Sequence, residues 1–128
     1  AHRNEDMKRL ETTATQLICG LASSSMGLKH TITFCDDFPA LVNDPELTKM
    51  VSEVAKSQGR EVIEMDEPFP WSEDFSWIAL ECPSAFFGVG SGKDHSPLHS
   101  LHYDFPDDII STAVDMFISI LNHFFPLL

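Results

Sequence analysis

The C-terminal segment restricts what this chain can fold into more than any other part of the sequence. From Ile109 to Leu121 the predicted helix is apolar at most positions, so it has almost no polar face. A helix of this kind is normally buried on most sides. A chain of 128 residues provides little protein in which to bury it. We therefore expect this helix to contact more protein than the chain itself supplies.

The rest of the chain alternates between two hydrophobic periods. Spacing close to 3.6 residues predicts helices, and alternation or a short apolar run between turn residues predicts strands. The predicted helices cover residues 4–25, 44–59, 72–80 and 109–121, and the predicted strands cover residues 28–35, 61–65 and 84–89. Asp44 and Pro45 are a typical helix start. The alternation of helices and strands is typical of an α/β fold.

Net charge and cysteine content limit which partners the chain can bind and which compartment it occupies. The formal net charge is -12, which repels nucleic acid and anionic membranes, so we expect neither as a partner. Two interpretations of the negative charge remain open: it keeps the protein in solution, or it attracts metal cations. Cys19, Cys35 and Cys82 are widely spaced and include no Cys-x-x-Cys, which indicates free thiols in a reducing, cytoplasmic setting. No apolar run reaches the length of about 18 residues expected of a membrane span.

Three short motifs carry most of the functional information. In the segment from Pro97 to Asp108, His99 and His102 precede a group of carboxylates and then the apolar helix. A neutral imidazole in a loop of this kind is a good ligand for a divalent metal. The other two motifs lie upstream, Ser-Glu-Asp-Phe at residues 72–75 and Ala-Phe-Phe-Gly-Val-Gly at residues 85–90.

These motifs, in this order, resemble the C-terminal part of the metal-dependent amidohydrolase and metallopeptidase family, which includes aminoacylases, hippurate hydrolases and auxin-conjugate hydrolases. Residues 37–44 also resemble the segment by which the family's chain re-enters its catalytic domain. The resemblance implies a two-domain α/β hydrolase with a βαββαβ lid. Residues 1–36 would be the last helix and strand of the lid or dimerisation domain, and residues 37–128 the C-terminal segment of the catalytic domain.

The resemblance also assigns roles to individual residues. His99 matches the family's last metal ligand, and Glu73, Asp74 and Gly90 match positions beside the substrate cleft. The alternatives are a loop histidine bonded to a backbone carbonyl for His99, and a carboxylate that satisfies a helix N-terminus for Glu73. His30 is interpreted as a packing or capping residue. We assign no catalytic residue, because the family's general base comes from a Glu-Glu pair that is absent from this sequence.

The function implied by this resemblance is cleavage of the amide bond of N-acyl amino acids or small peptides. A divalent metal, Zn or Mn, is expected in the full-length protein, and none is expected to bind tightly to this chain alone. The chain alone is expected to be inactive, and to form a homo-oligomer or to pair with a companion chain. The alternative is a non-catalytic α/β interaction module that associates with itself or with a partner.

Overall fold

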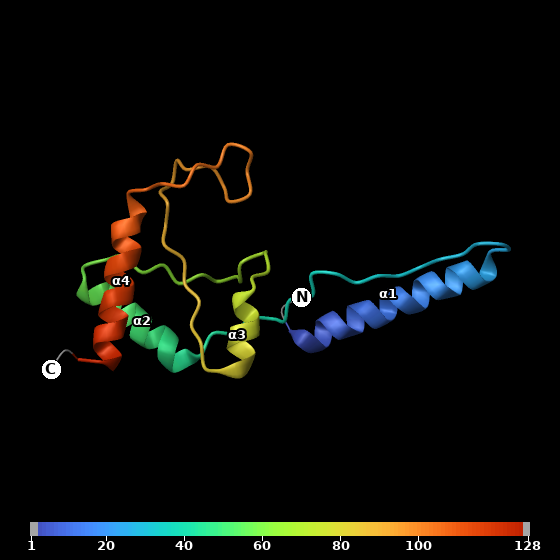
Figure 1. Cartoon of the computed structure of the whole chain (residues 1–128), viewed down its shortest axis with the longest axis horizontal. Helices are drawn as coiled ribbons and strands as arrows, with labels where there is room; N and C mark the ends of the chain where they lie inside the picture. The colour runs from blue at the N-terminus through green and yellow to red at the C-terminus, as the bar shows by residue number, and fades with distance from the viewer. Residues whose placement is uncertain (1–2, 127–128) are drawn as a thin grey trace. The chain divides into compact units, whose positions relative to one another are not determined.

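The computed structural model describes residues 3–126, and the regular secondary structure within this range is helical (Figure 1). All four helices fall close to predicted ones. In chain order they are α1 (Asn4–Ser24), α2 (Pro45–Ser57), α3 (Phe75–Glu81) and α4 (Ile109–Phe124).

The predicted α/β class is wrong for the part of the chain that is described. Residues 28–35, 61–65 and 84–89 have the side-chain pattern of strands, but they form no strand between residues 3 and 126. A strand requires a neighbouring strand that exchanges backbone hydrogen bonds with it. The sequence pattern reports which side chains suit a pleated surface, and it does not report whether a neighbour is present. These segments therefore remain irregular chain.

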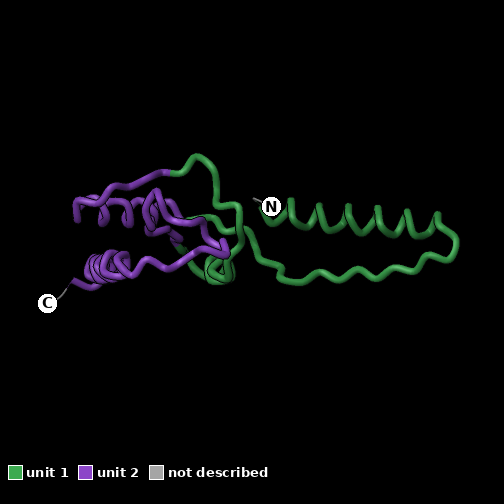
Figure 2. Tube along the Cα trace, turned by 90° about the horizontal axis from the view of Figure 1, so that it is seen from above, with its two compact units in different colours: residues 1–43, 65–84 green, residues 44–64, 85–128 purple. Residues whose placement is uncertain are grey.

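The chain divides into two compact units, each made of two stretches of sequence (Figure 2). Unit 1 consists of Ala1–Asn43 and Met65–Ser84, and unit 2 consists of Asp44–Glu64 and Ala85–Leu128. The predicted boundary between residues 1–36 and 37–128 concerns the domains of a longer relative, and it stays a prediction. Residues 1–2 and 127–128 lie outside the described residues.

In unit 1, the chain reverses direction after α1, and residues 28–40 run back alongside the helix (Figure 1). We call residues 28–40 the returning segment. Glu5 and Asp6 lie in the first turn of α1, where carboxylates interact favourably with the helix dipole. Gly27 follows the helix with a φ of +81°, a left-handed conformation that suits glycine. Asn4 is the first helical residue, and its side-chain oxygen accepts a hydrogen bond from the backbone N–H of Ala40. The start of α1 is thereby tied to the end of the returning segment.

In unit 2, α2 begins as the sequence predicts. Asp44 occupies the N-cap, its side-chain oxygen accepts a hydrogen bond of 2.9 Å from the N–H of Leu47, and Pro45 is the first helical residue. The buried core joins α2 to α4 and consists of Met50, Val54, Ala55 and Met116.

A polar cluster at the end of α2 adds to this contact. The Arg60 guanidinium lies 3.2 Å from the Asp115 carboxylate and donates a hydrogen bond to the Thr112 hydroxyl. The Gln58 amide donates to the Ser119 hydroxyl over 2.6 Å. Because these side chains are only partly buried, each bond contributes modestly to stability. Their main effect is to fix the register of α2 against α4.

Helix α4 keeps much of its apolar surface in contact with solvent. Met116 is 4% exposed, but six other apolar side chains of this helix are between 48 and 58% exposed. These are Ile110, Val114, Phe117, Ile118, Leu121 and Phe124. Contiguous apolar surface of this kind marks interaction sites in soluble proteins. The described residues thus do not bury the apolar side chains of α4, although the sequence of this helix is typical of a buried one.

Candidate functional site

His99 lies in a turn of unit 2, in the segment between Gly90 and α4. The N–H of Ser100 donates a hydrogen bond of 3.1 Å to the carbonyl of Pro97, and the N–H of Tyr103 donates one of 3.0 Å to the carbonyl of Ser100. The Ser100 hydroxyl also accepts a hydrogen bond from the N–H of His102. Two consecutive turns therefore hold the backbone on both sides of His99.

The backbone of His99 is left-handed, with a φ of +65°. Few residues other than glycine adopt this conformation, although histidine does so more often than most. Such a conformation costs free energy and is enriched at functional sites. The side chain is exposed. The turn therefore presents an accessible imidazole from a constrained backbone, an arrangement suited to a single metal ligand.

The two histidines that flank this turn differ in burial. His95 is half-buried, with its Nδ1 3.3 Å from the carbonyl oxygen of Ser96 and its ring edge-on to Tyr103 at a centroid distance of 5.3 Å. His95 therefore packs locally against Tyr103. His102 is exposed.

Glu73 and Asp74 lie at the start of α3, in unit 1. The backbone carbonyl of Glu73 accepts hydrogen bonds from the hydroxyl of Ser76 at 2.7 Å and from its N–H at 3.1 Å. Asp74 is the N-cap residue, but its side chain makes no capping hydrogen bond. Glu73 satisfies the helix start through its backbone, so this contact does not occupy its carboxylate.

Gly90 lies in unit 2, where a Cβ added to it would meet no other atom within 4 Å. In the described residues the conformation that requires glycine occurs nearby at Gly92, with a φ of +99°. The open space beside Gly90 is compatible with a position at the edge of a cleft. Within unit 2, neither a close contact nor a left-handed backbone requires glycine at this position.

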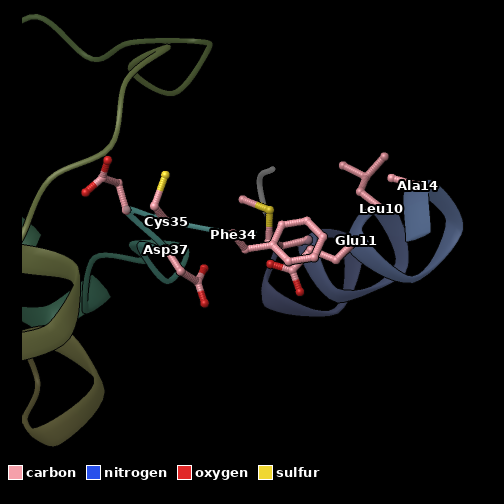
Figure 3. Close-up of a pocket in the computed structure, with 8 residues that line it drawn as sticks. Leu10, Glu11, Ala14, Phe34, Cys35 and Asp37 are labelled. Carbon is pink, nitrogen blue, oxygen red and sulfur yellow. The ribbon is translucent and has the colours of Figure 1, made fainter. Parts of the chain in front are cut away.

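Sequence reasoning missed a groove in unit 1, between α1 and the returning segment (Figure 3). It has a volume of about 340 Å³ and is lined by Met7, Leu10, Glu11, Ala14, Phe34, Cys35, Asp36 and Asp37. The apolar stripe of α1 and the alternation of residues 28–35 were the signals for it. It combines apolar side chains with the carboxylates of Glu11, Asp36 and Asp37, and none of its described lining residues is basic. Carboxylates without a basic neighbour repel an anionic ligand.

Comparison with known proteins decides the family. Residues 5–123 match the peptidase family M20/M25/M40. The chain belongs to this family. The match runs through α4 and the His99 turn, and it confirms the relationship inferred from the three motifs.

This member of the M20 family is similar to several staphylococcal proteins that are named as uncharacterized hydrolases. A Staphylococcus saprophyticus hydrolase is 29% identical over 95% of this chain and 33% of its own length. A Staphylococcus haemolyticus hydrolase is 25% identical over 95% of this chain and 34% of its own length. The chain thus spans about a third of the length of these relatives. No solved structure gives a significant match to it.

The M20 family generally uses divalent metals, so the donor set of this chain can be tested for fit. Within residues 3–126, no group of three or more His, Cys, Asp or Glu side chains is placed to hold a metal ion. Metal catalysis typically needs about three protein ligands and an open position. Of the residues assigned to the site, Glu73 and Asp74 belong to unit 1, and Gly90 and His99 belong to unit 2. The described residues therefore form no complete donor set for a divalent metal, and His99 is a candidate for one ligand of such a set.

The helices of this M20 family member give no sign of a membrane span. None within the described range is both long enough and apolar enough to cross a bilayer.

Proposed function

We propose that this chain forms the C-terminal part of an M20 hydrolase that cleaves the amide bond of N-acyl amino acids or small peptides. The observation that carries the proposal is the family match over residues 5–123, which includes every motif that we assign to the site. The hydrolase names of the relatives support the reaction class. The choice of an amide as the bond cleaved rests on the peptidase family.

Within this proposal, His99 supplies one imidazole ligand to a divalent metal, Zn or Mn, in the full-length protein. A divalent metal held there would supply Lewis-acid chemistry, which can lower the pKa of a bound water and polarise a carbonyl. The exposed side chain of His99 and its constrained turn support this role. Glu73, Asp74 and Gly90 line the substrate cleft, and no residue of this chain acts as the general base.

The substrate class is tested on a full-length protein that carries this sequence as its C-terminal third. Release of free amine from N-acetyl amino acids, N-benzoyl amino acids and dipeptides is measured with added Zn²⁺ or Mn²⁺, and phosphate monoesters serve as the control substrates. We expect turnover of at least one amide and none of the phosphate esters. Hydrolysis of the esters without hydrolysis of any amide would show that the proposed substrate class is wrong.

A second candidate function is a non-catalytic interaction module, and the exposed apolar side chains of α4 favour it. The same surface supports our proposal that the chain forms a homo-oligomer or pairs with a companion chain.

The acidic charge argues against nucleic acid and anionic membranes as partners. Three free cysteines suit a cytoplasmic protein, and we include that location in the proposal.

The 128-residue chain is expected to self-associate through α4. Light scattering across micromolar concentrations should give a mass above that of one chain. Phe117→Lys should lower that mass, because it places a charge in the centre of the exposed face. The matched control is Glu53→Lys, at an exposed position of α2. A concentration-independent monomer that binds no dye specific for apolar surface would argue against association by this face.

A further inference from the structure

Unit 1 contains a thiol–imidazole contact that plays no part in the proposed hydrolysis. Cys19 on α1 and His30 in the returning segment are eleven residues apart, and the Cys19 Sγ lies 3.3 Å from the His30 Nε2. Cys19 is half-buried and His30 is exposed. The contact forms because the chain reverses direction after α1 and runs back alongside it (Figure 1).

Among residues 3–126, the other two cysteines have no comparable partner. The Cys82 thiol donates a weak hydrogen bond of 3.6 Å to the carbonyl of Ile78 and lies 3.7 Å from the Ser84 hydroxyl. Neither a carbonyl nor a hydroxyl accepts a proton as a base at neutral pH. Cys35 is exposed at one end of the groove of unit 1, and among the described residues no imidazole is hydrogen-bonded to its thiol. Cys19 is thus distinguished from the other cysteines by its base.

We propose that Cys19 and His30 form a reactive pair at which a peroxide oxidises the thiol. In the tautomer with its proton on Nδ1, the His30 Nε2 accepts the proton of the Cys19 thiol and leaves a thiolate, the nucleophilic form of cysteine. The thiolate sulfur attacks one oxygen of hydrogen peroxide, an S–O bond forms, and the O–O bond breaks. The departing hydroxide takes the proton from His30 and becomes water. Cys19 is oxidised by two electrons to a sulfenic acid, and the peroxide is reduced.

The surroundings of Cys19 determine what this oxidation does to unit 1. The sulfenic acid is larger than the thiol, and it forms where α1 and the returning segment meet. Cys19 is a free thiol in the described residues, and the hydrogen-bond partner of its sulfur is the imidazole of His30. The structure therefore points to a sulfenic acid that is not resolved into a disulfide within one chain, and that a thiol from solution would reduce.

The test treats the complete chain with hydrogen peroxide in the presence of dimedone, which traps sulfenic acids, and follows the three cysteine-containing peptides by mass spectrometry. Because general-base assistance typically contributes a large rate factor, we expect Cys19 to be labelled at least about tenfold faster than Cys35 or Cys82. His30→Gln should remove most of this difference. His123→Gln, at an exposed histidine of α4, should leave it unchanged.

Loss of folding cannot produce the expected result. If His30→Gln loosened unit 1, the half-buried Cys19 thiol would become more accessible, and its labelling would accelerate. Slower labelling of Cys19 alone, with Cys35 and Cys82 unchanged, therefore supports the pair. Equal labelling of the three cysteines in the unmodified sequence, or labelling of Cys19 that His30→Gln leaves unchanged or accelerates, would show that His30 does not activate the thiol.

Discussion

The isolated 128-residue chain is expected to show no metal-dependent hydrolysis of N-acetyl or N-benzoyl amino acids. Two requirements of the reaction are unmet by its residues. No group of three donors is placed to hold a metal within residues 3–126, and the sequence has no Glu-Glu pair to supply the family's general base. General acid–base catalysis alone typically contributes a factor of about 10² to 10⁴ to the rate. Without it and without a held metal, turnover should fall to the rate of the buffer.

This expectation is checked by measuring free amine release with the chain alone, in the presence of Zn²⁺ or Mn²⁺, beside a full-length protein that carries the same sequence. The full-length protein controls for substrate and metal quality. Turnover by the chain alone that disappears in His99→Asn would contradict the account, because it would mean that this sequence holds a working metal site.

The helices were predictable because their signals are local. The Asp44 cap and Pro45 fix the start of α2 through contacts within one turn. Gly27 lies in the turn that follows α1 and has a left-handed backbone that suits glycine. The spacing of apolar residues that predicts each helix can be read from the residues of that helix alone. The same locality explains why α4 could be recognised as a helix that this chain alone does not bury.

The strands were not predictable, because pairing depends on residues far away in sequence. Residues 28–35 alternate as a strand does, but in the described structure they lie beside α1 instead of beside another strand. The alternation is a property of a buried pleated surface, and such a surface exists only when a neighbour completes it. A chain that spans about a third of its relatives' length can carry the pattern without the neighbour.

The candidate site was predictable in part. The motif around His99 identified the family, and the role of His99 as a ligand stays a prediction. The motif gave no sign of the left-handed backbone, which lies between two hydrogen-bonded turns. The contact between Cys19 and His30 was missed, and His30 was interpreted as a packing residue. Eleven residues separate the two side chains, and only the reversal after α1 brings them together.

The assignment of His99 as a metal ligand predicts the second large effect. In a full-length protein that carries this sequence, His99→Asn removes the imidazole, and asparagine tolerates the left-handed backbone of this position. The fold of the turn should therefore survive. Loss of one direct ligand should cost more than the roughly 10- to 100-fold that loss of an outer-shell partner costs in metal affinity or activity. His102→Asn is the matched control, since it changes an exposed histidine of the same segment.

The most direct measurement is the content of bound Zn or Mn, together with the rate of amide hydrolysis, in the full-length protein and in these two variants. We expect His99→Asn to lose both metal and turnover, and His102→Asn to keep both. Full metal content and full rate in His99→Asn would show that His99 is not a ligand of the metal site.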